Sequence, residues 1–262
     1  MNVATCVICL LLATAVIAQD CGSKGPRSKT GGEWPWLASI VEFSSGRTPS
    51  FLCAGILISR SHVLTASHCF DGKPLSPRRY AVLLGGASSD TGAEHNIFFI
   101  TRHPSYVRGK AYGDIAVLTL REDVPESTSF ICLPKAGQAY EYKPSFVSEF
   151  LPKKLGASDP FAPRSSRVLI GANNDCQSHY NGKGVTEIDQ GITDSILCSD
   201  LRGKQGECDR LTASPLMVPD TSVRWSVVGI AAHRPSCLDQ TNPGIYTRVT
   251  YYLPWIQDVM NS

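Results

Sequence analysis

The sequence has no excess of charge of one sign. Its 25 Lys and Arg residues are almost matched by 23 Asp and Glu residues, which leaves a formal net charge of +2. Proteins that bind nucleic acids usually concentrate positive charge, so we expect no nucleic-acid partner. The sequence also lacks an internal repeat, an Asn-x-Ser/Thr site and any apolar run of membrane-spanning length. We therefore expect neither N-glycosylation nor a membrane span.

One apolar run does occur near the N-terminus, from Val3 to Ile17. It is too short to span a bilayer and is followed by small residues, a pattern typical of a secretory signal peptide. We predict a signal peptide over residues 1–18, with cleavage after Ala18, and a secreted, extracellular chain of residues 19–262. A buried N-terminal helix is the alternative interpretation.

Closely spaced pairs of cysteines are absent after the predicted signal peptide. Of the 10 cysteines, Cys6 and Cys9 lie inside that peptide, and the others form no C-x₂₋₄-C pair. We therefore expect no zinc or other metal site and no cofactor. An even number of cysteines in an exported chain predicts four disulfides, and the spacing alone leaves their pairing open.

Short stretches rich in β-branched and aromatic residues, bounded by Gly, Pro, Ser or Asp, predict β-strands throughout the chain. They are residues 51–58, 80–85, 96–101, 114–120, 225–232 and 244–250. Only residues 251–260 place their apolar side chains on one helical stripe. The segment from Lys135 to Lys154, rich in Pro and Lys, is expected to connect two halves. The pattern indicates an all-β fold.

Five motifs, in this order, resemble the chymotrypsin/trypsin-type serine protease domain over nearly all of residues 19–262. They are EWPWLASI (33–40), CAGILISRSHVLTASHC (53–69), GDIAVLTL (113–120), FICLP (130–134) and PGIYTRVTYYLPWI (243–256). The resemblance implies two six-stranded antiparallel β-barrels, at about residues 33–130 and 138–250, with the active-site cleft between them. A short C-terminal helix is implied at about residues 251–260.

The resemblance also implies how the cysteines pair. The implied disulfides are Cys21 with Cys132, Cys53 with Cys69, Cys176 with Cys198, and Cys208 with Cys237.

The catalytic site of this family needs a hydroxyl nucleophile, an imidazole base and a buried carboxylate. His68 and Asp114 match the imidazole and carboxylate positions within their motifs. The family's third motif is G-D-S-G-G-P, and counted from Cys208 this chain has R-L-T-A-S-P instead. Thr212 replaces the nucleophilic Ser, and its extra methyl stiffens χ1 and hinders the hydroxyl. We interpret these three residues as the remnant of a triad and expect no functional catalytic residue.

Two further replacements lie in the same motif. Arg210 stands where the amide of a Gly helps to form the oxyanion hole, and a residue with a Cβ resists the backbone dihedrals that Gly permits there. Leu211 stands where an Asp pairs with the N-terminal ammonium that activation cleavage creates, and Leu cannot accept that charge. Replacing a buried ion pair with an apolar side chain is often neutral or stabilising, so Leu211 predicts a folded protein.

The substrate cleft differs from the family pattern as well. Gly206 lies where a trypsin-like enzyme has an Asp at the base of the specificity pocket. Ala232, His233 and Arg234 replace the S-W-G segment whose backbone pairs with substrate as an added strand. The side chain of Arg234 is expected to obstruct the mouth of the pocket.

These features favour a secreted, catalytically inactive serine protease homologue that acts by binding. By analogy with the family, it is expected to be a cofactor, decoy or inhibitor in an extracellular proteolytic or innate-immune cascade. Its partners would be other secreted proteins, such as proteases, complement proteins or further immune-cascade components. Two alternatives remain open. One is a weak or specialised serine-type endopeptidase that uses Thr212 with His68 and Asp114; the other is a glycan- or surface-binding protein.

Overall fold

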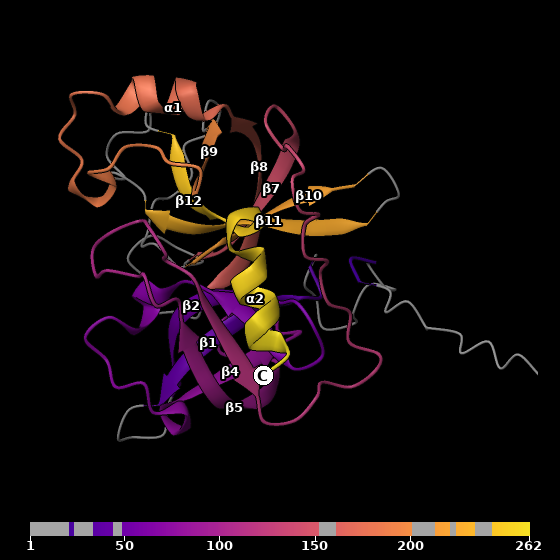
Figure 1. Cartoon of the computed structure of the whole chain (residues 1–262). Coiled ribbons are helices and arrows are strands. Elements are labelled where there is room, and N and C mark those ends of the chain that lie inside the picture. Colours follow the sequence, from indigo (N-terminus) through magenta and orange to yellow (C-terminus); the bar gives the residue numbers. More distant parts are fainter. Residues whose placement is uncertain are drawn as a thin grey trace, which may run out of the picture.

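The fold consists of two closed barrels, each of six antiparallel strands, and a short helix near the C-terminus (Figure 1). The computed structural model describes residues 21–23, 34–43, 49–151, 161–200, 213–220, 224–233 and 243–262. The all-β, two-barrel architecture predicted from the sequence is thereby confirmed.

The first barrel closes in the order β1-β2-β3-β6-β5-β4. Four of its strands correspond to predicted ones, namely β2, β4, β5 and β6. The strands are β1 (Leu37–Phe43), β2 (Pro49–Leu57), β3 (His62–Thr65), β4 (Tyr80–Leu84), β5 (Ala93–Arg102) and β6 (Ala116–Leu120).

The second barrel closes in the order β10-β11-β12-β9-β8-β7. The predicted strands at 225–232 and 244–250 correspond to β11 and β12. The strands are β7 (Pro144–Leu151), β8 (Ala162–Gly171), β9 (Ile196–Asp200), β10 (Pro215–Pro219), β11 (Trp225–His233) and β12 (Gly244–Arg248).

Two features of this barrel differ from the sequence prediction. The segment 135–154 was expected to connect the two halves and no strand was predicted in it, whereas it contains β7, which pairs with β8 along its whole length. A helix, α1 (Asn173–Tyr180), lies between β8 and β9 and was not predicted. Its sequence, NNDCQSHY, is mostly polar, and it is attached to β9 by the disulfide between Cys176 and Cys198.

Trp36 joins the cores of the two barrels. It is fully buried just before β1, and its indole Nε1–H donates to Sδ of Met217 on β10 at 3.3 Å. One hydrophobic cluster includes Trp36 together with residues of both barrels, such as Ile56 and Ile230. The barrels therefore share a core at their junction, which is where the family places its cleft.

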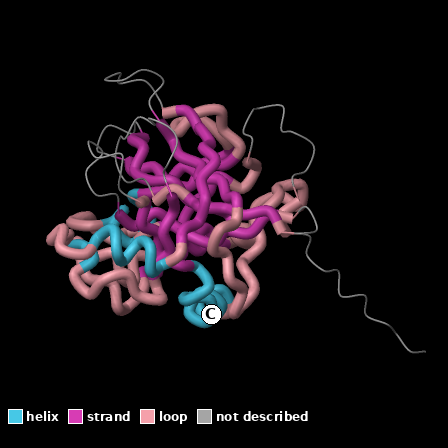
Figure 2. The backbone as a smooth tube through the Cα atoms, turned by 90° about the horizontal axis from the view of Figure 1, so that it is seen from above, coloured by secondary structure: helices cyan, strands magenta, loops and turns pink. Residues whose placement is uncertain are grey.

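The chain ends in helix α2 (Leu253–Met260), within the range predicted for a helix. A 3₁₀ turn, Val249–Tyr252, leads into it from β12. The helix extends from the second barrel over the first (Figure 1), and Leu253 and Ile256 are buried in the shared core. Seen from above, the helices lie outside the strands (Figure 2). Among the described residues, no helix has the length and apolarity needed to cross a membrane.

Candidate active site

His68 and Asp114 are brought together by the pairing of β3 with β6. Thr65, the last residue of β3, pairs with Ala116, the first residue of β6. His68 lies on the 3₁₀ turn Ser67–Phe70 that follows β3, and Asp114 lies two residues before the start of β6. Residues 46 positions apart in the sequence thus meet at one end of the first barrel.

The two side chains are hydrogen-bonded. The Nδ1–H of His68 donates to Oδ2 of Asp114 at 2.6 Å, and the backbone N–H of His68 donates to Oδ1 at 2.8 Å. The Asp114 side chain is 1% exposed and that of His68 is 20% exposed. A buried carboxylate that receives Nδ1–H fixes the tautomer of the imidazole, which leaves Nε2 as the proton-accepting atom.

Several contacts hold this pair in place. Ser67 Oγ donates to the backbone carbonyl of Ile115 at 2.7 Å. Thr247 Oγ1, from the second barrel, donates to the carbonyl of Asp114 at 2.9 Å. The disulfide between Cys53 and Cys69 ties the His68 turn to β2. The imidazole and the carboxylate are therefore positioned by both barrels.

A second carboxylate supports the His68 turn and was not found by the sequence analysis. Asp71, directly after the turn, accepts hydrogen bonds from Arg102 Nη2 and from the Tyr106 hydroxyl, each at 2.8 Å. Burial, followed by the carboxylates of Asp114 and Asp71, raises the pKa of Tyr106 above its usual range. Tyr106 therefore stays a neutral donor near neutral pH. No sequence motif marks these residues, because their meeting depends on the tertiary fold.

Many of the other predicted site residues lie outside the described part of the chain. These are Gly206, Arg210, Leu211, Thr212 and Arg234. Their distances from His68 are therefore not part of the description.

Two predicted cleft residues lie on β11. Ala232 is buried in a cluster that also contains Ala111 from the first barrel and Ile188 from the second. His233 is described only by its backbone, as the last residue of the strand.

Three of the four disulfides implied by the resemblance are present. They join Cys21 with Cys132, Cys53 with Cys69, and Cys176 with Cys198. The fourth pair, Cys208 and Cys237, falls outside the described residues.

One group of side chains has the composition of a metal site, namely Cys53, His68 and Cys69. The two sulfur atoms are bonded to each other, at 2.01 Å. Since a metal needs thiolates as ligands, this group offers only the imidazole and cannot hold zinc while the disulfide is intact.

Ala213, which follows Thr212, has a left-handed backbone with φ of 56°. It is fully buried, and the family motif has Gly at this position. A non-glycine residue pays about 1 to 2 kcal/mol for this conformation. Ala213 therefore adopts a backbone conformation that glycine, but not alanine, adopts without strain.

Replacing Ala213 with Gly is expected to leave the free energy of unfolding almost unchanged. The loss of a buried methyl and the added freedom of the unfolded chain together lower the free energy of unfolding by about 1 to 2 kcal/mol. Relief of the left-handed strain raises it by about the same amount. The control is Ala38→Gly, at a fully buried strand position with extended backbone, which lacks that relief and should lose about 1 to 2 kcal/mol. Urea unfolding measures both, and equal losses would show that Ala213 is not strained.

Comparison with known proteins agrees with this geometry. The chain is similar to "Atrial natriuretic peptide-converting enzyme" of Homo sapiens, with 28% identity over 260 residues, covering 91% of this chain and 23% of that protein. It is 30% identical to "Transmembrane protease serine 11C" of Mus musculus over 236 residues, covering 88% of this chain and 52% of that protein. It is 29% identical to "Transmembrane protease serine 11G" of Rattus norvegicus over 233 residues, covering 87% and 53%.

The chain thus spans about half the length of two of these relatives and about a quarter of the third. The family model described as "Trypsin" matches residues 24–256, which include both barrels and the His68–Asp114 pair. The two closed barrels, the paired imidazole and carboxylate between β3 and β6, and this match together establish that the chain belongs to the trypsin family.

Proposed function

We propose that this chain is a catalytically inactive member of the trypsin family that acts by binding other proteins. The observation that carries the proposal is the sequence R-L-T-A-S-P at residues 210–215, where the family has G-D-S-G-G-P. Three elements of the catalytic apparatus depend on that motif: the nucleophile, the oxyanion hole and the activation ion pair. The proposed inactivity rests on their loss together.

Thr212 and Arg210 affect the chemical step directly. The methyl group of Thr212 restricts χ1 and crowds the carbon that a carbonyl must approach. Arg210 is at the position of a Gly whose amide stabilises the oxyanion, and losing one such donor lowers turnover by about 10² to 10³. A proton acceptor on His68 does not compensate, since it acts only when the nucleophile and the oxyanion donors are in place.

Leu211 affects the switch that assembles the site. In the family an Asp at this position receives the new N-terminal ammonium after activation cleavage. A leucine side chain offers no charge to that ammonium, so cleavage upstream has no ion pair to form. Because an apolar replacement of a buried ion pair is often neutral or stabilising, the protein is proposed to stay folded in one state.

The part of the site that matches the family motifs supports a role as a rigid scaffold. The hydrogen bonds of Asp114 to His68, the link from Thr247, and the Cys53–Cys69 disulfide stabilise the junction of the barrels whether or not catalysis occurs. A barrel junction held in this way provides a rigid framework for recognition of a protein partner.

We further propose that the chain is secreted. The apolar run from Val3 to Ile17 is the expected signal peptide, and disulfides such as Cys21–Cys132 form in oxidising, extracellular compartments. Two relatives are named transmembrane proteases, so the proposal of secretion rests on the N-terminal run and the disulfides of this chain. Its proposed role as a cofactor, decoy or inhibitor in a proteolytic or immune cascade rests on analogy with inactive family members.

A weak hydrolase is the second candidate, and one observation favours it. The Nδ1 of His68 lies 2.6 Å from Oδ2 of Asp114, which is the geometry that an active imidazole base requires. The residual activity would have to use the Thr212 hydroxyl as its nucleophile.

A fluorophosphonate probe distinguishes the two candidates. The purified protein, before and after limited trypsin treatment, is expected to gain no covalent mass at Thr212. Thr212→Ser is expected to remain unlabelled as well, because Arg210 and Leu211 still prevent assembly of the oxyanion hole. Intact mass spectrometry provides the measurement, with active trypsin as the positive control.

Labelling of the unmodified chain that disappears in His68→Ala would establish a functional nucleophile and overturn the proposal. Labelling of Thr212→Ser alone would show that the threonine methyl is the sole defect, and that the arguments from Arg210 and Leu211 are wrong.

A further inference from the structure

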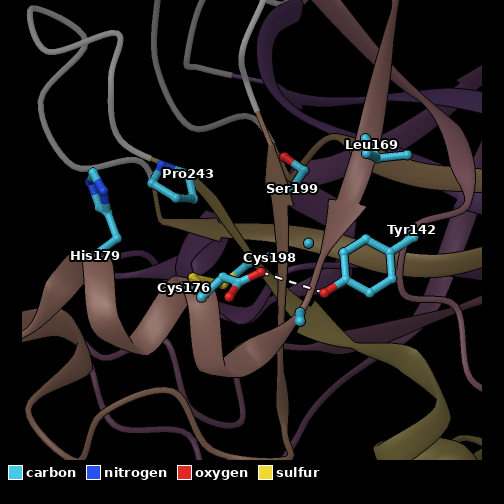
Figure 3. Close-up of a pocket in the computed structure, with 10 residues that line it drawn as sticks. Tyr142, Leu169, Cys176, His179, Cys198, Ser199 and Pro243 are labelled. Carbon is cyan, nitrogen blue, oxygen red and sulfur yellow. Dashed lines mark hydrogen bonds between the residues drawn. A yellow bond between two sulfur atoms is a disulfide. The ribbon is translucent and has the colours of Figure 1, made fainter.

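A cavity of about 300 Å³ lies on the second barrel (Figure 3). It is formed where β8 ends, α1 begins and β9 passes beneath, with the Cys176–Cys198 disulfide in its wall. Its size is at the lower end of the range for ligand pockets, which suits a single side chain better than a large molecule. None of the residues that line it belongs to the proposed triad.

Among the described residues that line the cavity, Asp175 is the one with a carboxylate. This residue is exposed and lies in the first turn of α1, where the helix dipole favours a negative charge. The hydroxyl of Tyr142 donates to its Oδ2 at 3.5 Å, drawn as the dashed line in Figure 3. Within the described part of the chain, no Lys or Arg forms an ion pair with Asp175. The cavity therefore holds a negative charge that remains available to a ligand.

Tyr142 forms an exposed aromatic wall of this cavity. Its backbone is left-handed, with φ of 59°, and its residue is 64% exposed. The backbone N–H of Tyr142 donates to the carbonyl of Ile170 at 2.7 Å, which holds it against β8. A non-glycine residue in this backbone conformation carries strain. Because the ring of Tyr142 is mostly exposed, burial of the ring offsets little of that strain. Ligand contact would supply the missing stabilisation.

At the opposite end of the cavity, Nε2 of His179 forms a hydrogen bond with Nζ of Lys183 at 2.8 Å. Lys183 is not among the residues that line the cavity. Asp175 therefore sets the sign of charge that the cavity accepts.

We propose that this cavity binds an arginine side chain presented by a partner protein. A guanidinium group is planar, so it can form paired hydrogen bonds with the Asp175 carboxylate while it stacks on the ring of Tyr142. Leu169, which is 38% exposed, extends the apolar rim beside Tyr142. A free amino acid would leave this rim in water, whereas the surface around an arginine on a protein would cover it. The proposal does not depend on whether Thr212 is inert.

Nuclear magnetic resonance titration of the ¹⁵N-labelled, disulfide-bonded protein tests the site. The probes are Nα-acetyl-arginine amide and its neutral isostere Nα-acetyl-citrulline amide. The arginine probe is expected to give saturable shifts of the backbone resonances of Gly171 and Asp175, and the citrulline probe is expected to bind at least about tenfold more weakly. Equal binding of the two probes would overturn the charge recognition.

Two variants locate the binding. Asp175→Asn keeps the shape but removes the charge, and should weaken the arginine probe at least about tenfold. The matched control is Asp194→Asn, an exposed carboxylate on the turn before β9 that does not line the cavity, and it should leave affinity unchanged. Gly171→Val should block binding, since a Cβ there meets only the Cys198 carbonyl oxygen at 4.0 Å and the new side chain has room to fill the cavity. Normal binding by either Asp175→Asn or Gly171→Val would overturn the assignment.

A capped Leu-Arg-Leu tripeptide separates a protein partner from a free amino acid. It is expected to bind more tightly than Nα-acetyl-arginine amide, because its leucines can cover Leu169 and Tyr142. Equal affinities of the two probes would contradict a partner protein as the source of the arginine.

Discussion

The Trp36→Ala variant is expected to lose about 3 to 5 kcal/mol of the free energy of unfolding, the largest effect of any single substitution proposed for this chain. Trp36 is fully buried at the junction of the barrels, and its indole donates to Met217 on the other barrel. Removing it deletes a large apolar surface and leaves a cavity in the shared core. Because both barrels contact this side chain, they should lose stability together. Urea unfolding followed by circular dichroism measures the change.

The control for Trp36→Ala is Phe99→Ala. Phe99 is also aromatic and also in the first barrel, but it is 55% exposed, so its loss should change stability by less than about 1 kcal/mol. A similar small loss for Trp36→Ala would mean that the barrels do not depend on a shared core. Two separate unfolding transitions in the unmodified chain would lead to the same conclusion.

Removing the Cys21–Cys132 disulfide, as Cys21→Ser with Cys132→Ser, is expected to cost about 4 to 5 kcal/mol. The linked residues are 111 positions apart, and in the chain-entropy description a crosslink over such a loop strongly restricts the unfolded chain. The crosslink also holds Gly22 in place, where its N–H donates to the carbonyl of Phe130 and its carbonyl accepts from the N–H of Trp225 on β11. Thermal and urea unfolding of the doubly substituted protein measure the loss.

The comparison for this prediction is the pair Cys53→Ser with Cys69→Ser. Its residues are 16 positions apart, so the same description gives a smaller loss of about 3 kcal/mol. A larger loss for the shorter loop would show that strain or packing in the folded state, rather than the entropy of the unfolded chain, decides the effect of these crosslinks.

The barrel architecture could be predicted from the sequence, but two elements of the second barrel could not. Strand β7 has serines at buried positions, where alternation would favour apolar residues; Ser145, for example, satisfies its hydroxyl by donating to the carbonyl of Val168. Helix α1 buries only Cys176 and Tyr180, so it has no apolar stripe that a search for helical periodicity could detect. Both elements are stabilised by tertiary contacts rather than by their local pattern.

The site shows the same difference between residues marked by a local motif and residues joined only by tertiary contacts. His68 and Asp114 were identifiable because each lies within a motif characteristic of the family, and the hydrogen bond between them is present. The contacts of Asp71 with Arg102 and Tyr106 were not identifiable, because each joins residues more than thirty positions apart without any motif. The cavity around Asp175 likewise arises from four segments that only the fold brings together.

Closure of both sheets has a consequence for behaviour at high concentration. In the order of pairing around each barrel, the final strand also pairs with the first strand. This closing pair is β4 with β1 in the first barrel and β7 with β10 in the second. Every described strand therefore has a partner strand on both sides, which leaves less unpaired backbone for a strand of another molecule than an open sheet would. Native molecules should therefore resist amyloid-like self-association at high concentration.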